Sequence, residues 1–363
     1  MLQAIVALDT WNEVSVLQHA PWLVQLLAAS ILRQAGITPG AHLAAINLGL
    51  KTISVDRRRQ RDRETRLLAI AHGFLATAEI GMKEHDRLVF APGPARPVSW
   101  VENVWYDPVR LPVASIKSAA RSLRGIQRNW ALYPVRHHGR AKLIQEQLPH
   151  VSAKPLVFPA TAPTAPLGSW MMEDEHTLIA SANCSSPFRN GEVEFIENRT
   201  APPNRAYLKL WEALAIAGGM PGPESVTVDL GSSPGGWTWV LHELGAHVIS
   251  IDKAPLAPAI AALPRVDFRK QSAFALTPAD LGPIDWLCSD VICYPERLLR
   301  LVRTWIDSGL CRNFICTIKF QGATDHAITR EFAAIPGSRV VHLHHNKHEL
   351  TWMLIGGKVP TKT

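Results

Sequence analysis

A glycine-rich turn between two apolar segments constrains this chain more than any other feature. Residues 228–230 read as a buried strand, the turn follows at residues 231–236, and a second apolar run, residues 248–251, ends in Asp252. Glycines let backbone N–H groups approach a ligand closely, and an acid at the tip of the neighbouring strand can accept both hydroxyls of a ribose. The pattern predicts a nucleoside cofactor, the alternative being a plain tight turn between a strand and a helix.

The turn departs from two better-known glycine loops. A Walker loop ends in Gly-Lys-Ser/Thr, whereas Gly236 is followed by Trp237 and Thr238. The Gly-x-Gly-x-x-Gly dinucleotide fingerprint is also absent, because Gly231 is followed by Ser-Ser-Pro before the next glycine. Neither a nucleoside triphosphate nor a dinucleotide is therefore the expected ligand.

The sequence of the turn, Asp-Leu-Gly-Ser-Ser-Pro-Gly-Gly-Trp at residues 229–237, resembles motif I of the FtsJ-like ribose 2'-O-methyltransferases, which bind S-adenosylmethionine. The resemblance implies a Lys-Asp-Lys-Glu catalytic tetrad, and each member has a counterpart in the expected order. Lys209 precedes motif I, Asp290 and Lys319 each end an apolar run, and Glu349 opens the last one. The ordered quartet favours a catalytic site over a structural ion-pair cluster or unrelated surface charges.

The spacing of these residues agrees with a parallel sheet. The carboxyl ends of parallel strands share one edge, so Asp290 and Lys319 are expected at the same rim as the glycine turn. Glu349 reaches that rim if residues 339–345 and 349–355 form an antiparallel hairpin, an arrangement that the family resemblance supplies. The predicted fold class is α/β, a Rossmann-like seven-stranded methyltransferase sheet at the C-terminus, preceded by an α+β N-terminal region of THUMP-like character.

The implied reaction is the attack of a ribose hydroxyl on a methyl sulfonium. The hydroxyl is a poor nucleophile near neutral pH, so a site gains by holding it against a base and excluding water. Lys319 is the expected base, because a second cation at Lys209 favours the neutral, proton-accepting form of an amine. Asp290 and Glu349 are expected to position the lysines and the hydroxyl and to place negative charge near the sulfonium.

The cofactor contacts are implied by position in the motif. The turn is expected around the methionine part and Asp252 at the ribose, while packing between helix and sheet is the alternative for Trp237. The family's acid after the third strand is missing, and Gln271 or Ser272 stands in its place, which is a departure from the pattern. The expected contacts are Asp229, Gly231, Ser233, Pro234, Gly235, Gly236, Trp237, Asp252, Gln271 and Asp290.

Composition limits the number of domains and the cellular compartments that are expected for this protein. The 363 residues are 47% hydrophobic and 19% charged, which suffices for two or three domains with sizeable cores. The five cysteines lack Cys-x-x-Cys spacing and lie mostly in or beside apolar runs, so reduced thiols in a cytoplasmic protein are expected and zinc ligands are not. The apolar segment 20–32 is short, interrupted and preceded by no basic region, so neither export nor membrane insertion is expected.

The net charge of +7 indicates an anionic partner, and its distribution is uneven. Acids interrupt the arginines of residues 57–66, which favours a solvated helical face. Between residues 117 and 142, basic residues lie near Trp130 and Tyr133 in the sequence. If both aromatic residues are exposed, this region is suited to bind phosphates and unstacked bases. The alternative is that both aromatic residues belong to a core. The expected RNA-binding residues, the first four on one helical face, are Lys117, Arg121, Arg124, Arg128, Arg136, Arg140 and Lys142.

Histidines gather at residues 137–138 and 342–348. No pattern of acids accompanies them in the sequence, so exposed or RNA-facing histidines are expected and a metal site is not.

Pro-rich segments at residues 91–97 and 160–166 indicate loops. We expect an α+β region of unknown role at residues 1–92, with strands at 3–8 and 42–48 and helices at 23–34 and 65–80. A THUMP-like RNA-binding region at 93–182 should add a helix at 141–147 and strands at 154–158 and 177–182. A linker at 183–204 resembles that of the cytidine 2'-O-methyltransferases of large-subunit ribosomal RNA, and the FtsJ-like methyltransferase domain should span 205–357.

The resemblance as a whole implies an S-adenosylmethionine-dependent RNA 2'-O-ribose methyltransferase, with ribosomal RNA as the expected substrate and no DNA or membrane partner. One alternative is a non-catalytic RNA-binding protein on a methyltransferase fold, which would not need all four tetrad residues. Another is a methyltransferase for a base, a protein or a small molecule. Enzymes for base amino groups would more often show an Asn/Asp-Pro-Pro-Tyr/Phe motif, and residues 290–293 read Asp-Val-Ile-Cys.

Overall fold

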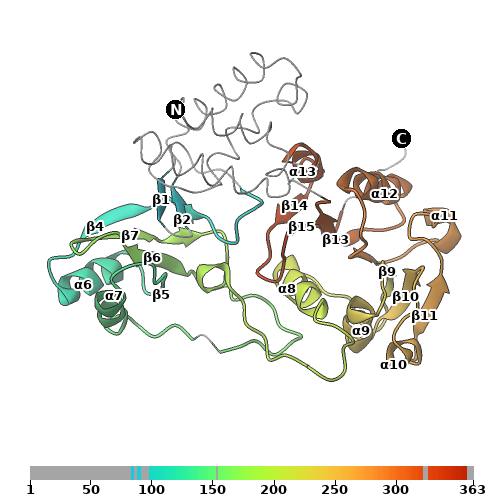
Figure 1. Cartoon of the computed structure of the whole chain (residues 1–363), viewed down its shortest axis with the longest axis horizontal. Coiled ribbons are helices and arrows are strands. Elements are labelled where there is room, and N and C mark those ends of the chain that lie inside the picture. The colour runs from blue at the N-terminus through green and yellow to red at the C-terminus, as the bar shows by residue number, and fades with distance from the viewer. Residues whose placement is uncertain (1–82, 86–87, 91–97, 153, 322–325, 358–363) are drawn as a thin grey trace, which may run out of the picture. The chain divides into compact units, whose positions relative to one another are not determined.

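The chain divides into two compact units, Met1–Ala95 and Arg96–Thr363. The computed structural model describes residues 83–85, 88–90, 98–152, 154–321 and 326–357 (Figure 1). In the first unit these residues form an antiparallel hairpin of β1 (Lys83–His85) and β2 (Leu88–Phe90). The elements expected at 3–8, 23–34, 42–48 and 65–80, and the charged run 57–66, lie outside the described residues.

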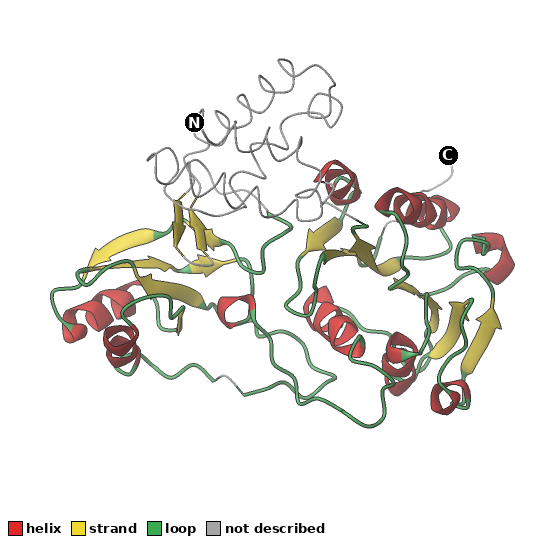
Figure 2. Cartoon of the chain, viewed as in Figure 1, coloured by secondary structure: helices red, strands yellow, loops and turns green. Residues whose placement is uncertain are grey.

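A seven-stranded sheet in the second unit confirms the predicted α/β fold (Figures 1 and 2). The strand order is β11-β10-β9-β12-β13-β15-β14, and β15 alone runs antiparallel to its neighbours. The order reverses between β9 and β12, and ligands bind open α/β sheets at such a switch point. The strands are β9 (Val226–Leu230), β10 (His247–Asp252), β11 (Val266–Lys270), β12 (Trp286–Ser289), β13 (Asn313–Lys319), β14 (Ser338–Val341) and β15 (Glu349–Leu354).

Helices cover both faces of this sheet, because successive side chains of a strand point to opposite faces and both are apolar here (Figure 2). On one face, Val228 and Leu230 share a core with side chains of α12 (Pro295–Ser308) and α13 (His326–Ala333). On the other face, Val248 and Ile315 share a core with α8 (Tyr207–Ala217) and α9 (Gly236–Glu243). Two short helices complete the crossovers, α10 (Pro258–Ala261) and α11 (Pro278–Leu281).

Helix α8 is buried without interruption from Tyr207 to Ala215. A helix that is apolar on every side belongs inside a domain, yet this one carries Lys209 and Glu212, which are 8% and 3% exposed. An unpaired charge at such a depth costs several kcal/mol, on the order of 3–5 when a partner is removed. Both side chains must therefore have partners, and both lie at the candidate site.

A second, four-stranded sheet has the order β4-β7-β6-β5, with helices α6 and α7 in the same region (Figure 1). Helix α6 begins at a capping box of Ser115 and Ser118 and buries Ala119, Ala120 and Leu123. The elements are β4 (Val109–Pro112), α6 (Ile116–Ile126), β5 (Trp130–Leu132), α7 (His138–Gln145), β6 (Gly168–Met172) and β7 (Thr177–Ser181), with a separate pair β3 (Trp105–Tyr106) and β8 (Asn183–Cys184) and the short η2 (Arg189–Gly191).

Several boundaries expected in this region are wrong. The helix expected at residues 141–147 is α7, which begins at His138 and ends at Gln145. Instead of a strand at residues 154–158, Leu156 makes one isolated bridge to Phe195. Helix α6 ends at Ile126, so Arg128 does not share a helical face with the basic residues before it.

Trp130 explains where α6 ends. Its indole N–H donates to the backbone oxygens of Leu123 and Gln127, each at 3.0 Å, and so satisfies carbonyls that a helix leaves open at its C-terminus. The side chain is completely buried in the core of this region. The core alternative therefore holds for Trp130, and its expected role as an exposed stacking surface is wrong.

Candidate active site

Four charged side chains converge at the carboxyl edge of the seven-stranded sheet. Lys209 Nζ lies 2.9 Å from Asp290 Oδ1 and 2.6 Å from Glu349 Oε1, and Lys319 Nζ lies 3.1 Å from the same Asp290 oxygen. Lys319 and Glu349 are direct partners in the β13–β15 ladder, which explains how the end of one strand meets the start of the next. The structure thus brings all four predicted tetrad residues into one cluster.

Lys209 is the charged anchor of this cluster. Burial lowers the pKa of its ammonium, but the charges of Asp290 and Glu349 and their hydrogen bonds outweigh burial, so the pKa is raised above its usual value. Lys209 is consequently a stable cation that binds two carboxylates, and it draws the end of β12 and the start of β15 together.

Lys319 is held by a single residue from two sides. Its ammonium group contacts the Asp290 carboxylate and also donates to the Asp290 backbone oxygen at 2.5 Å. Because Asp290 contacts both lysines, one carboxylate fixes the separation of the two amines. Lys319 retains 18% exposure of its side chain, so its amine is at the edge of the cluster where a hydroxyl can reach it.

Glu212 positions the loop that leads to Glu349, a role that sequence reasoning missed. Its carboxylate accepts hydrogen bonds from the backbone N–H groups of His344 and His345, at 2.7 and 3.0 Å, and lies 2.6 Å from His345 Nδ1. Glu212 follows Lys209 by one helical turn, so α8 holds both Glu349 and the loop before it. A charged residue in a wholly apolar helix was the available signal.

The glycine turn lies beside this cluster, between β9 and α9. Gly231 has a φ of +78°, and a Cβ added there would lie 2.6 Å from the Cα of Val291, so only glycine fits. The backbone of the turn is therefore pressed against the segment that follows Asp290. Gly235 caps α9 with a φ of +115°, so the turn leads directly into the N-terminus of that helix.

Asp252 reaches this turn from the tip of β10. One carboxylate oxygen accepts from the Ser233 N–H at 3.0 Å and the other from the Ala254 N–H at 2.9 Å. A carboxylate can accept about four hydrogen bonds, so capacity remains for the hydroxyls of a ribose. The Ser232 hydroxyl is buried beside Gly231 and has no hydrogen-bond partner among the described residues. The free acceptor capacity, the close-packed glycine and the unsatisfied hydroxyl all fit a bound nucleoside.

Two residues predicted to contact the cofactor have side chains engaged elsewhere. Asp229 is completely buried, and burial raises the pKa of its carboxyl to about 7; it accepts a hydrogen bond from the Thr238 hydroxyl at 2.7 Å. The Trp237 indole is 3% exposed and donates to the Ala206 oxygen at 3.0 Å, as the packing alternative requires. Both side chains hold the turn in place. Gln271 lies beside Asp252, and its backbone N–H donates to the Asp252 backbone oxygen at 3.0 Å.

The basic residues expected to bind RNA are exposed with one exception, Arg140. Lys117, Arg121 and Arg124 are exposed on α6, and Arg128, Arg136 and Lys142 are exposed outside that helix. Arg140 instead is half-buried and donates to the Val113 oxygen at 3.3 Å, so it serves the packing of its own region. Tyr133 is half-buried with its ring edge-on to Trp105 at 6.5 Å.

The histidines of residues 342–348 have acidic partners that the sequence did not reveal. His344 Nδ1 lies 3.6 Å from the Glu102 carboxylate, an interaction that raises the pKa of the imidazole, and His345 contacts Glu212. The expectation that these histidines lack acids is therefore wrong. Glu102 is more than 200 residues away in the chain, so no local pattern could indicate it. Within the described residues, no group of His, Cys, Asp or Glu is arranged to hold a metal ion.

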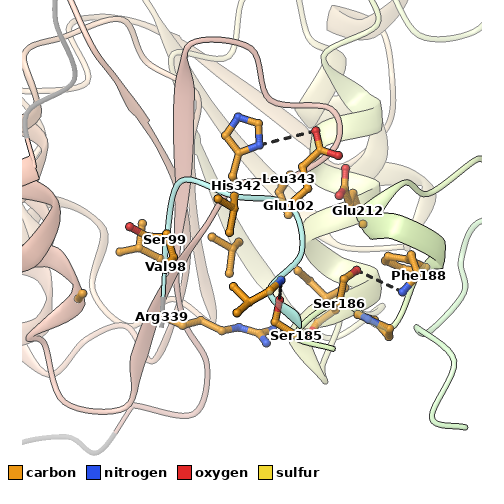
Figure 3. A pocket seen from close by; sticks show the side chains of 18 of the residues that line it. Val98, Ser99, Glu102, Ser185, Ser186, Phe188, Glu212, Arg339, His342 and Leu343 are labelled. Carbon is orange, nitrogen blue, oxygen red and sulfur yellow. Dashed lines mark hydrogen bonds and ion pairs between the residues drawn. The ribbon is translucent and has the colours of Figure 1, made fainter. Parts of the chain in front are cut away.

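A cavity of 720 Å³ lies apart from the tetrad (Figure 3). Its walls come from residues 98–106, residues 185–191, α8 and the α13–β14 segment, and Glu102 and His342 approach to 4.0 Å across it. None of the predicted catalytic or cofactor residues is among the described residues that line it. Glu212, which holds the loop before Glu349, also lines the cavity.

The reversal of strand order, the glycine turn and the acid at the tip of β10 define a nucleoside-binding Rossmann-like fold of the methyltransferase class. Comparison with known families agrees: residues 202–326 match the FtsJ-like methyltransferase family. Residues 1–94 match a different family, described as a protein of unknown function, DUF1612.

Individual relatives match different parts of the chain. Ribosomal RNA large subunit methyltransferase M of Alkalilimnicola ehrlichii is 31% identical over 50% of this chain and 54% of its own length. The protein of the same name from Halorhodospira halophila is 36% identical over 41% of this chain and 46% of its own length. The chain thus spans about half the length of these relatives. An uncharacterized protein, y4cF, of Sinorhizobium fredii is 84% identical over 25% of this chain and 24% of its own length.

Solved structures match at lower similarity. The fibrillarin pre-rRNA processing protein of Methanococcus jannaschii aligns with 43% of this chain and 77% of its own at 20% identity, with a TM-score of 0.32. At that level the likeness carries no functional conclusion.

Within the part of the chain that the structure describes, no helix is long and apolar enough to cross a membrane. All five cysteines are free, and burial raises the pKa of four of their thiols, Cys288, Cys293, Cys311 and Cys316.

Proposed function

We propose that the protein transfers the methyl group of S-adenosylmethionine to a ribose 2'-hydroxyl of RNA, with ribosomal RNA as the substrate. The observation that carries the proposal is the contact of two lysines with one carboxylate, Asp290, at the rim where the glycine turn lies. The match to the FtsJ-like family and the names of the two ribosomal RNA methyltransferases support the class of reaction and the class of substrate.

Asp252, Gly231 and the backbone of residues 232–236 would hold the cofactor. When bound there, S-adenosylmethionine supplies an electrophilic methyl group on a cationic sulfur. Lys319 has to be a neutral amine to accept a proton, so Lys209 then offsets one of the two carboxylates and the cluster presents no net positive charge to that cation. The turn and the segment after Asp290 are in close contact, which excludes water from this side of the site.

Lys319 in this proposal accepts the proton of the attacking hydroxyl. Asp290 orients the amine through its carboxylate and its backbone oxygen, and Lys209 keeps Asp290 and Glu349 in place. Glu349 pairs with Lys209 and would help to position the side chains around the hydroxyl. Positioning of this kind, together with a general base, supplies a large part of the barrier reduction in such reactions.

A retained fold without activity is the main alternative, and the tetrad argues against it. A binding module has no need to gather two lysines and two acids at a partly buried site, since burial of charges seldom stabilises a fold. The absence of an Asn/Asp-Pro-Pro-Tyr/Phe motif at residues 290–293 likewise disfavours transfer to a base amino group. The five free thiols are compatible with the reducing cytoplasm, where we propose the protein acts.

The direct test uses the purified protein with methyl-labelled S-adenosylmethionine and ribosomal RNA from cells that lack the gene. After digestion to nucleosides, the label is expected in a 2'-O-methylnucleoside, and mapping the position lost in those cells identifies the nucleotide. Label in a base-methylated nucleoside, or transfer to none of the RNA, would contradict the proposal. Ribosomal RNA from cells that keep the gene is the matched control, because its target should already be methylated.

The exposed basic residues form the proposed RNA surface. Replacing Arg121, Arg124 and Arg128 together with glutamine is expected to weaken RNA binding and to reduce the slope of log K against log salt by up to about 2–3, since each lost phosphate contact removes about 0.7–0.9. Binding of single-stranded RNA between 50 and 200 mM salt, roughly the range over which such contacts dominate, measures this slope. Arg303→Gln on α12 is the control, because Arg303 is paired with Glu331 at 3.1 Å. An unaltered slope would move the RNA surface elsewhere.

A further inference from the structure

Two apolar side chains stand in solvent immediately after Asp290. Ile292 is 74% exposed and Tyr294 is 68% exposed, the highest values among the large hydrophobic residues of the described part of the chain. Soluble proteins expose single apolar residues routinely, but two adjacent ones at the mouth of a site indicate a binding surface. We call residues 291–294 the lip.

The lip alternates in burial and bends at Cys293. Val291 and Cys293 are half-buried and pack against the core, whereas Ile292 and Tyr294 point outward. The two exposed side chains flank the bend at Cys293, and both face solvent within four residues of Asp290. Tyr294 is the N-cap of α12 and precedes Pro295, which fixes the backbone at this end of the lip.

The lip lies against both parts of the proposed active site. Val291 lies against the glycine turn at Gly231, and Cys293 packs against the core cluster that contains Ile318, the neighbour of Lys319. Ile292 and Tyr294 follow Asp290 by two and four residues, at most about 7 and 14 Å of extended chain. A nucleotide whose ribose lies at Lys319 therefore places its own base or the next one within reach of the lip.

The charges near the lip favour a nucleic acid over a protein partner. The first turns of α12 present Arg297 and Arg300 as exposed side chains, with Glu296 the one acid among them. The Arg297 guanidinium lies 3.8 Å from the centre of the Phe274 ring. Basic groups beside an exposed aromatic ring are what single-stranded RNA binds, because phosphates meet the charges and bases stack on the ring.

We propose that the lip is the base platform of the enzyme: a base within one nucleotide of the acceptor ribose stacks on Tyr294 and contacts Ile292. The platform rests on the proposed function, because it takes the acceptor ribose to lie at Lys319. Tyr294 is a positioning residue in this proposal and takes no part in proton transfer. Recognition by stacking tolerates any base, so the platform contributes affinity and orientation more than sequence preference.

The test compares the full-length protein with Tyr294→Ala, Tyr294→Trp and the control Val157→Ala, which removes an exposed apolar side chain far from Asp290 in the sequence. The probes are a fluorescent oligocytidylate and an abasic oligoribonucleotide of the same length, measured by anisotropy. Tyr294→Ala should weaken oligocytidylate binding about tenfold and leave abasic binding unchanged, while Tyr294→Trp and Val157→Ala bind both as the wild type does. With methylatable RNA, Tyr294→Ala should raise KM and leave kcat and cofactor affinity within about twofold.

Three outcomes would overturn the platform. They are oligocytidylate binding by Tyr294→Ala that equals the wild type, an equal loss on both probes, and a changed oligomeric state in sedimentation, which would assign the lip to a protein interface. Methylation by the wild-type protein distinguishes failure of the proposed function from failure of the platform. If it methylates no ribose, the function is wrong, whereas active wild-type enzyme with an unaffected Tyr294→Ala variant rejects the platform alone. Tyr294→Phe keeps the ring and should bind both probes as the wild type does. It therefore tests the platform with a conservative change if the alanine variant misfolds.

Discussion

Replacing Lys319 with alanine is expected to lower kcat for ribose methylation by about 10²- to 10⁴-fold, the usual contribution of a general base. The substitution removes the amine at the exposed edge of the tetrad and leaves the glycine turn and Asp252 untouched. Affinity for S-adenosylmethionine should therefore stay within about threefold of the wild type. A labelled-methyl assay gives kcat, and calorimetric titration with the cofactor gives its affinity.

The matched control for this variant is Lys347→Ala. Lys347 is exposed and precedes Glu349 by two residues, so it tests whether positive charge near the rim is enough to explain a loss of activity. Its kcat should remain within about twofold of the wild type. Turnover by Lys319→Ala at the wild-type rate would reject the base assignment. Partial recovery of Lys319→Ala by a small added amine would separate a proton acceptor from a residue that only positions others.

Replacing Lys209 with methionine is expected to destabilise the fold by about 3 kcal/mol or more, because it leaves the partly buried Glu349 carboxylate without its cation. The Lys209 side chain is 10% exposed and lies 2.6 Å from Glu349, so solvent cannot replace the lost partner. The double variant Lys209→Met/Glu349→Gln should recover a large part of this loss, since no uncompensated charge remains at that position. The free energy of unfolding in urea measures all three proteins.

The exposed ion pair of Arg303 and Glu331 is the control for the buried pair of Lys209 and Glu349. Both side chains are about half exposed, at 50% and 52%, so Arg303→Met should cost less than about 1 kcal/mol. If Lys209→Met costs no more than this control, the cluster does not depend on its buried ammonium. A double variant as unstable as Lys209→Met alone would show that the loss comes from packing and not from the stranded carboxylate.

The placement of two proposed active-site residues could be predicted from a local pattern, whereas Lys209 was assigned through the family resemblance alone. Asp290 and Lys319 end apolar runs, and the carboxyl ends of parallel strands meet whatever the sequence between them. The position of Glu349 could not be predicted from a local pattern, because it depends on an antiparallel last strand that only the family resemblance supplied. The register that sets it opposite Lys319 is a property of the folded sheet.

The predictions that failed depend on contacts between distant segments. Trp130 looked like a surface aromatic because it follows a basic stretch, but its indole closes the end of α6 inside the core. The histidines looked free of acids because Glu102 and Glu212 lie far away in the chain. Arg128 was assigned to a helical face that the helix does not reach, because the capping by Trp130 ends it at Ile126.

The sequence by itself determined the class of fold and the place of the glycine turn, because strand polarity and glycine geometry follow from local rules of backbone chemistry. The family resemblance singled out the four charged residues. The tertiary structure decided which charges neutralise one another, which aromatic residues are buried and which apolar residues face solvent beside Asp290. Those outcomes depend on burial, and burial is set by segments that meet only after the chain has folded. The lip at residues 291–294 became visible for that reason: its alternation has a meaning only once Val291 is seen against Gly231.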